Sequence, residues 1–199
     1  MSSNPPEGSL GVAEWGTYFD VAFVCTGNRF RSPLAAALLS ARTDDLPVRT
    51  SSVGILDLGS TPALPEAVRL ARSFGVDLSG HRTRCLSDVN LESLELVLAF
   101  EWTHVHAAIV DGHARIDRTF TLPELVGLLE RLPRASGPQS VPVVQARARV
   151  EAAHSLRPRD FTRRRSPEIP DPLGRPPSEQ RRIAEEVRVL VDGLSRMLF

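Results

Sequence analysis

A thiol and an arginine lie six residues apart in the segment CTGNRFRSP, residues 25–33. The apolar run before Cys25 is typical of a buried strand, and the residues after Pro33 are typical of a helix. A strand end, a tight loop and a helix N-terminus can form an anion cradle, because the amide N–H groups point at the anion. The same field favours the thiolate of Cys25, and Arg31 can hold two oxygens of a tetrahedral oxyanion. The segment therefore predicts attack by sulfur on a phosphate ester.

The residue types of the loop favour this interpretation over the ordinary one, in which a cysteine at a strand end is a small buried hydrophobe. Gly27 and Asn28 tolerate the left-handed backbone that a tight loop needs, and a Ser-Pro pair suits the helix start. We therefore predict that Cys25 and Arg31 are catalytic, and keep the ordinary interpretation for Cys85. The substrate-binding residues are predicted to be Thr26, Gly27, Asn28, Arg29, Phe30 and Ser32.

Further segments, in the right order, resemble motifs of the low-molecular-weight protein tyrosine phosphatases, a family that shares its fold with thioredoxin-linked arsenate reductases. Residues 25–33 look like the phosphate-binding loop of that family. Residues 52–54 (Ser-Val-Gly) resemble its second strand, and residues 75–84 resemble its Gly-x-Asp-x-Ser-x-His-x-x-Arg segment. Residues 96–100 resemble its third strand, and Asp171-Pro172 resembles the pair that carries the general acid.

The resemblance implies roles for residues outside the loop. Asp171 would be the catalytic general acid, and Asn28, Ser52 and His81 would link by hydrogen bonds that keep the loop rigid. The hydroxyl group of Ser32 can donate a hydrogen bond to the sulfur of the nucleophile. Ordinary alternatives stay open: a turn residue for Asn28, a strand-end hydroxyl for Ser52, a polar residue flanking a helix for His81, and an Asp-Pro turn for Asp171.

The implied reaction is hydrolysis of a phosphate monoester in two steps. Cys25 attacks phosphorus to form a cysteinyl-phosphate, while the general acid protonates the leaving oxygen and then takes a proton from water. Three positions depart from the family pattern. Phe30 stands where a second cysteine is common, which excludes a protective disulfide within the loop. Leu173-Gly174 replace the aromatic residues of phosphotyrosine-selective members, so the substrate class is left open between protein phosphotyrosine and other phosphate esters.

The sequence has three alternatives to a phosphatase. Arsenate reduction would need an external small thiol, since Cys85 is the only other cysteine and an intramolecular relay of three thiols is excluded. The general acid Asp171 favours the phosphatase. A non-catalytic oxyanion-binding protein would be expected to lack the cysteine, the arginine or the aspartate, and Cys25, Arg31 and Asp171 are all present. A metal site formed by His104, His106 and His113 is not predicted, because the first two would face different sides of a helix, and no other cofactor is expected.

Composition bounds the class of protein. The 199 residues, of which 42% are hydrophobic, suffice for one domain with a sizeable core. A formal net charge of zero gives no general attraction to nucleic acid or anionic membrane. We expect no signal peptide and no membrane span, and the two cysteines favour a reducing compartment. The expected protein is a cytoplasmic monomer or weak dimer that acts on a phosphorylated protein or a small phosphate ester.

Strands and helices alternate along the chain. The expected strands are Phe19–Cys25, Val48–Ser52, Glu95–Phe100 and, more weakly, Ala114–Thr119. The expected helices are Pro33–Arg42, Pro65–Phe74, Trp102–Ile109, Pro123–Leu132 and Ser178–Leu198. This order predicts an α/β fold: a three-layer sandwich with a central, mostly parallel four-stranded sheet and helices on both faces. In such sheets ligands bind at the carboxyl ends of the strands.

The expected domain organisation is simple. Residues 1–16 are predicted to be a flexible tail, and residues 17–199 a single phosphatase-like domain. A Pro/Arg-rich segment at about 133–168 interrupts the alternation just before the proposed acid, which predicts an insertion with a helix at Val143–Leu156. The insertion can be interpreted as a basic lid that attracts anionic substrate or as a solvated loop.

Overall fold

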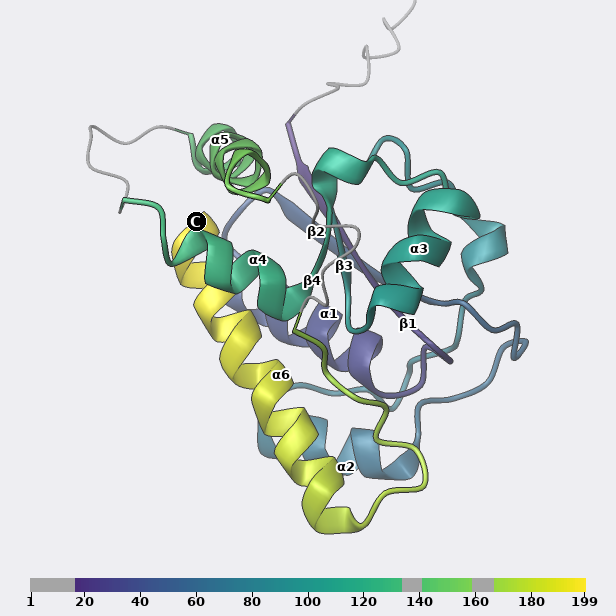
Figure 1. Cartoon of the computed structure of the whole chain (residues 1–199). Coiled ribbons are helices and arrows are strands. Elements are labelled where there is room, and N and C mark those ends of the chain that lie inside the picture. The colour runs from purple at the N-terminus through teal and green to yellow at the C-terminus, as the bar shows by residue number, and fades with distance from the viewer. Residues whose placement is uncertain (1–16, 134–140, 159–166) are drawn as a thin grey trace, which may run out of the picture.

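The computed structural model describes residues 17–133, 141–158 and 167–199. The strands are β1 (Phe19–Cys25), β2 (Val48–Gly54), β3 (Leu96–Ala99) and β4 (Thr119–Thr121). They form one four-stranded sheet in the order β2-β1-β3-β4, and every neighbouring pair is parallel. The helices are α1 (Arg31–Arg42), α2 (Pro65–Ser73), α3 (Trp102–Val110), α4 (Leu122–Leu129), α5 (Pro142–Ser155) and α6 (Pro177–Leu198) (Figure 1). Short 3-10 helices cover Leu86–Asp88 and Ile116–Arg118.

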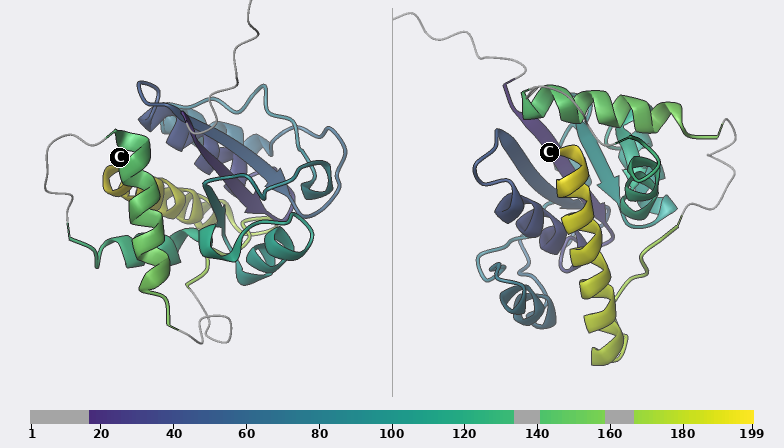
Figure 2. Two further views of the ribbon diagram at one scale, coloured as in Figure 1. Left: turned by 90° about the horizontal axis from the view of Figure 1, so that it is seen from above. Right: turned by 90° about the vertical axis from the view of Figure 1, so that its left-hand side faces the viewer.

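Side chains of the central strand β1 alternate between two cores, because successive strand residues point to opposite faces. Phe19, Val21 and Phe23 belong to the larger core, which α1 and α6 cover. Ala22 and Val24 belong to the smaller core, which α3 covers (Figure 2). The strand is therefore apolar almost throughout, as expected when both faces of a parallel sheet are buried. This confirms the predicted three-layer α/β sandwich.

The fourth strand differs from its prediction. A strand was expected at Ala114–Thr119, whereas the extended and paired segment is Thr119–Thr121, which lies beside Val97–Ala99. Residues 116–118 form a 3-10 turn instead. The Thr121 side chain then accepts a hydrogen bond from the Glu124 amide and caps α4. The strand is short because the chain is extended only where β3 offers it backbone partners.

Helix α5 confirms the helix predicted near residues 143–156 and is fastened to the sheet by Arg157, just beyond its end. The Arg157 guanidinium donates to both carboxylate oxygens of Glu124, at 3.0 and 2.9 Å, and to the carbonyl oxygens of Ile116 and Thr119. Residues 1–16, 134–140 and 159–166 lie outside the described part. The tail and the extent of the insertion therefore stay predictions.

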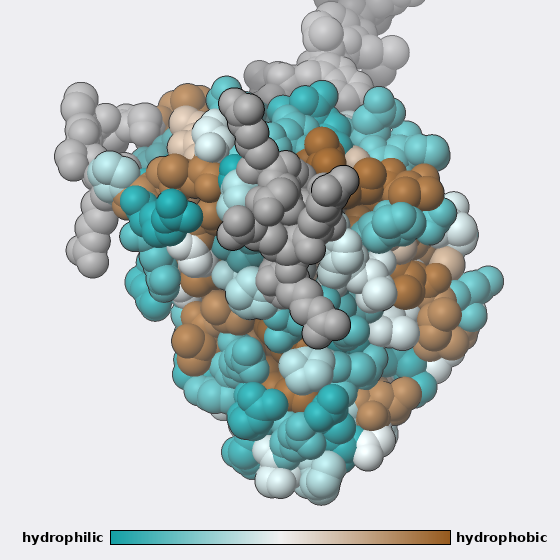
Figure 3. All heavy atoms as spheres, in the orientation of Figure 1, coloured by the Kyte–Doolittle hydropathy of each residue, from teal (hydrophilic) through white to brown (hydrophobic). Residues whose placement is uncertain are grey.

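The face of the molecule drawn in Figure 3 is largely hydrophilic, with separate hydrophobic patches. Across the described ranges, none of the helices combines the length and apolarity needed to cross a membrane.

Candidate active site

Cys25 ends β1 at the edge of the sheet where all four parallel strands end, and the chain then loops into α1. The cysteine is 2% exposed, and its Sγ lies 3.0 Å from Ser32 Oγ. Among the residues that the structure describes, none accepts a hydrogen bond from the amide N–H groups of residues 27–31. These amides are free to bind an anion, which is the chemistry expected at a strand–loop–helix junction.

Asn28 holds the loop from beneath. Its φ of 52° is in the left-handed region that asparagine tolerates, and its side chain is fully buried. Its Nδ2 donates to Ser32 Oγ at 2.9 Å and to Ser52 Oγ at 2.8 Å. Its Oδ1 accepts from the Arg84 amide at 3.0 Å. One buried amide group thus ties the loop to α1, to β2 and to the segment that follows His81.

His81 and Gly54 hold the loop from two further sides. His81 Nε2 donates to the Asn28 carbonyl oxygen at 2.7 Å. Partial burial lowers the pKa of His81, so the neutral ring that serves as this donor is favoured. A Cβ atom on Gly54 would lie 2.9 Å from the Asn28 amide nitrogen, so only glycine allows the loop to pack this closely on β2. Gly54 was not among the predicted site residues.

Arg31 is 1% exposed and joins four separate acceptors. One terminal nitrogen donates to the Glu101 carboxylate and to the Ile169 carbonyl oxygen, the latter at 2.9 Å. The other donates to Thr26 Oγ1 at 3.0 Å and to Asp171 Oδ2 at 2.6 Å. The guanidinium therefore connects the start of the loop with the proposed acid. An oxyanion that binds the terminal nitrogens of Arg31 would have to replace one of these acceptors, and Asp171 is the most exposed carboxylate among them.

Asp171 lies in a tight turn and beside the site at the same time. Its Oδ1 accepts from the Leu173 amide at 2.9 Å, its carbonyl oxygen accepts from Arg175 Nε at 2.6 Å, and Gly174 has a φ of 75°. The Asp171 side chain is 40% exposed. The turn leaves one carboxylate oxygen facing Arg31, so the two interpretations of the Asp-Pro pair are compatible.

Glu101 and His104 also belong to the site, although neither was predicted to act there. The Glu101 carboxylate accepts from the backbone of His104, and His104 Nδ1 accepts from the Glu101 amide at 3.1 Å, which caps α3 reciprocally. His104 Nε2 lies 3.0 Å from Thr26 Oγ1. Their place in the sequence could have indicated this: Glu101 comes just after β3, at the edge of the sheet where Cys25 ends β1. His106 and His113 are exposed, and the described residues contain no cluster of three possible metal ligands.

The site opens into a pocket of about 240 Å³. Its lining consists of loop residues, the proposed acid and a largely aliphatic wall: Cys25, Thr26, Gly27, Arg29, Phe30, Arg31, Leu56, Leu58, Leu64, Asp171 and Leu173. Of the predicted substrate-binding residues, Asn28 and Ser32 do not line it and are fully buried behind the loop.

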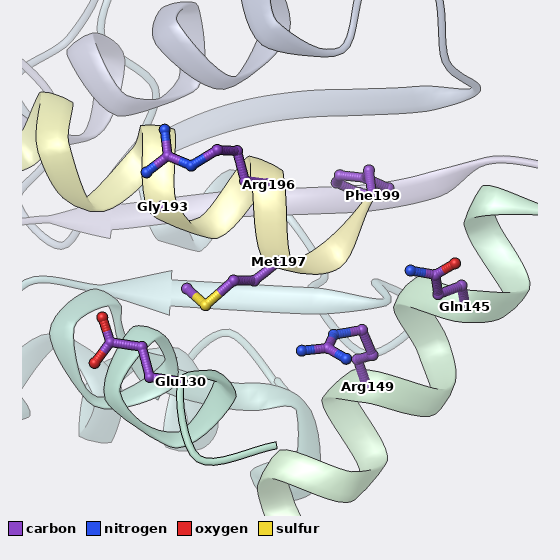
Figure 4. A pocket seen from close by; sticks show the side chains of 7 residues that line it. All are labelled: Glu130, Gln145, Arg149, Gly193, Arg196, Met197 and Phe199. Atoms are coloured by element: carbon purple, nitrogen blue, oxygen red, sulfur yellow. The ribbon is translucent and has the colours of Figure 1, made fainter. Parts of the chain in front are cut away.

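A larger pocket of about 600 Å³ lies elsewhere, between α5 and the C-terminal part of α6 (Figure 4). Its lining comprises Glu130, Gln145, Arg149, Gly193, Arg196, Met197 and Phe199. None of the predicted site residues is among them, so size alone does not mark the active site.

Comparison with known proteins agrees with this geometry. The model of the family "Low molecular weight phosphotyrosine protein phosphatase" matches residues 20–129. The chain belongs to this family. The matched part of the phosphatase includes the loop, the network around Asn28, Glu101 and His104, and it ends well before Asp171.

Individual relatives are phosphatases of two specificities. The protein-arginine-phosphatase of Bacillus subtilis (strain 168) is 38% identical over 112 residues, which cover 54% of this chain and 72% of that protein. The crystal structure of a low molecular weight protein tyrosine phosphatase from T. tengcongensis is 28% identical with a TM-score of 0.63, covering 88% of this chain and 96% of that one. A YwlE arginine phosphatase mutant with a phosphorylated active-site serine is 26% identical with a TM-score of 0.61, covering 90% and 95%.

Proposed function

We propose that this protein removes phosphate from phosphorylated proteins through a cysteinyl-phosphate intermediate. The observation that carries the proposal is the convergence of Cys25, Arg31 and Asp171 on one pocket, although Asp171 is remote from the loop in sequence. A nucleophile, a clamp for the oxyanion and an acid are the three parts that the reaction needs. The phosphorylated active-site serine of the related arginine phosphatase mutant supports a phosphoenzyme.

In the first step the Cys25 thiolate attacks phosphorus, so that a sulfur–phosphorus bond forms as the ester bond breaks. The amides of residues 27–31, for which no described residue is an acceptor, bind the phosphoryl oxygens. One N–H of Arg31 that donates a hydrogen bond to Asp171 donates instead to the phosphoryl group. Protonated Asp171 gives its proton to the leaving oxygen. The 2.6 Å contact between Arg31 and Asp171 keeps both groups within reach of the same bound phosphate.

In the second step water attacks the phosphocysteine, Asp171 accepts a proton from that water, and inorganic phosphate leaves as the thiolate is regenerated. Ser32 accepts a hydrogen bond from Asn28, and its own proton can stabilise the sulfur 3.0 Å away. Because Ser52 and His81 hold Asn28 on two other sides, the loop needs little rearrangement when charge builds up on the phosphoryl group.

The pocket favours an oxygen ester over phosphoarginine as substrate. Arg29 lines the pocket with its positive charge, and the guanidinium released from phosphoarginine is itself a cation. Like charges close together are unfavourable, whereas a neutral phenol leaving group meets no such repulsion. The aliphatic side chains of Leu56, Leu64 and Leu173 can pack against an aromatic ring. We therefore place phosphotyrosine ahead of phosphoarginine.

The function can be tested by turnover of an aryl phosphate, with Cys25→Ser as the matched control. Wild type should release phosphate, while the variant should bind inorganic phosphate without turnover, because the hydroxyl group is a far weaker nucleophile than a thiolate. Unchanged hydrolysis by Cys25→Ser would contradict the proposed nucleophile. Thiol-dependent arsenate reduction, measured on the same samples, should be absent if the protein is a phosphatase and not a reductase.

We further propose that the protein works in the cytoplasm as a monomer or weak dimer. Both cysteines are free thiols, and the proposed nucleophile has to remain reduced. Sedimentation at micromolar concentration and fractionation of cells that express the full chain would test the two parts separately.

A further inference from the structure

The Thr26 hydroxyl group occupies a special position in the site. Thr26 follows the nucleophile directly and lines the pocket. Its Oγ1 lies 3.0 Å from an Arg31 terminal nitrogen and 3.0 Å from His104 Nε2. A hydroxyl group can accept two hydrogen bonds and donate one. Arginine can only donate, so the direction of the remaining bond depends on which nitrogen of His104 carries the proton.

The cap of α3 determines that proton position. The Glu101 amide donates to His104 Nδ1 at 3.1 Å, so the proton of the neutral ring is on Nε2. Burial and, next, the positive charge of Arg31 lower the pKa of His104 to about 4, against the opposing charges of Asp171 and Glu168. The Glu101 carboxylate also faces this end of the helix, where it is paired with Arg31. His104 is therefore neutral near pH 7 and donates to Thr26.

We propose that His104 is a positioning residue that orients the Thr26 hydroxyl group toward the phosphoryl group bound above Cys25. Since Thr26 Oγ1 accepts from both Arg31 and His104, its own proton has to be donated in another direction, and the pocket lies beside it. This inference rests on the proposed function. Thr26 contacts the substrate, His104 acts through Thr26, and His104 keeps its proton throughout the reaction.

The advantage of this arrangement is preorganisation. A hydroxyl group without fixed partners rotates freely. Fixing its direction when a charged ligand binds costs free energy, which weakens the net interaction. Two donors from separate elements, the first turn of α1 and the first turn of α3, leave Thr26 one direction in which to donate. The loop thereby gains a fixed side-chain donor in addition to its backbone amides.

Two substitutions separate this role from helix capping. His104→Gln places an amide nitrogen near the position of Nε2, so it can still donate to Thr26. His104→Asn places an amide oxygen near the position of Nδ1, so it can still accept from the Glu101 amide but does not reach Thr26. The exposed His106 lies on the same helix, and His106→Asn is the matched control.

The primary measurement is affinity for inorganic phosphate, followed as protection of Cys25 from alkylation by iodoacetamide. We expect about tenfold weaker binding for His104→Asn and recovery of most of that loss for His104→Gln, as for one hydrogen bond to a charged ligand. Thr26→Val should cost about the same as His104→Asn, and the double variant should cost no more than either alone. For an aryl phosphate, kcat should fall in the same order, with a smaller change in KM.

A simple capping role predicts the opposite order, with His104→Gln the weaker binder. That order, or additive losses in the double variant, would overturn the proposal. If His104→Asn does not fold, Thr26→Ser and Thr26→Val compare the presence and absence of the hydroxyl group without changing α3, and equal phosphate affinities would refute it. Failure of the proposed function would give a different result: wild type would bind phosphate without hydrolysing an aryl phosphate. In that case the ranking of the variants by phosphate affinity would still decide the role of His104.

Discussion

Two buried arginines, one at the carboxyl ends of the strands and one near the start of β4, make the same kinds of contact but differ in the role that we propose for them. Arg31, at the carboxyl edge, is 1% exposed, lies 5.8 Å from the centre of the Phe100 ring and pairs with two carboxylates. Arg157, near the start of β4, is 8% exposed, lies 3.7 Å from the centre of the Phe120 ring and pairs with Glu124. Each also donates to backbone carbonyl groups.

The two arginines differ in how exposed their carboxylate partners are. The Glu124 side chain is 10% exposed and the Arg157 side chain 2%, so this pair is enclosed by protein and little of it is accessible to a ligand. The Asp171 side chain is 40% exposed and lines a pocket, and we propose that Arg31 exchanges it for a phosphoryl oxygen of the substrate. A buried arginine alone therefore does not mark a site; a buried arginine with an exchangeable acceptor does. Four predictions test this comparison.

The largest effect is expected for Arg31→Lys, which should lower kcat/KM for an aryl phosphate by about 10³-fold or more. A compact ammonium group cannot hold two phosphoryl oxygens in one plane as a guanidinium does. Steady-state kinetics measures the loss, and urea unfolding shows whether the variant is folded. Turnover within about tenfold of wild type would make Arg31 a structural clamp of the same kind as Arg157.

Next comes Arg157→Met, which should lower the free energy of unfolding by about 3–5 kcal/mol, because Glu124 is left buried without its partner. Once folded, the variant should keep kcat/KM within about twofold of wild type. Urea denaturation and kinetics on the same preparation measure both quantities. The double variant Arg157→Met/Glu124→Gln should regain part of the stability. Normal stability with reduced turnover would contradict the structural assignment.

Asp171→Asn should then slow turnover by about 10²-fold for phosphate esters whose leaving groups are strongly basic. Esters with weakly basic leaving groups should lose less, because they need little protonation as the bond breaks. A series of substituted aryl phosphates measures the trend. The same loss across the whole series would argue that Asp171 only holds Arg31, as Glu124 holds Arg157.

The smallest effect concerns pH and belongs to the Arg31 edge of the sheet. The pKa of His104 is about 4 in the folded protein and near 6.5 when unfolded, so protons bind preferentially to the unfolded chain. The contribution of neutral His104 to the free energy of unfolding is fully present above pH 6.5 and is lost as the pH falls toward 4. We expect a loss of about 2 kcal/mol between pH 7 and pH 5, to which the lowered pKa of His81 adds in the same direction.

Urea unfolding at the two pH values measures this slope. His104→Gln should reduce the slope, because glutamine does not titrate. An unaltered slope in His104→Gln would mean that His104 is not held neutral by the folded protein.

The predictable parts of the site are those whose determinants are local. Residues 25–33 carry their thiol, their turn formers and their helix start within one short segment, so strand, loop and helix could be placed together. Helix α6 was predicted because its apolar residues recur at helical spacing, which depends only on neighbours along the chain. By contrast, β4 was misplaced, because its extent depends on which residues β3 leaves available for pairing.

The sequence by itself determined the alternating α/β order and a cysteine loop suited to phosphate, since both follow from short-range spacing and residue type. Only the tertiary structure decided that Arg31 meets Asp171 and Glu101, and that His104 Nε2 lies within hydrogen-bond distance of Thr26 Oγ1. These contacts depend on the strand order β2-β1-β3-β4, which brings the ends of β1 and β3 to one edge. A hydrogen bond needs its two atoms within about 3 Å, and only the packed sheet places residues so distant in sequence that close together.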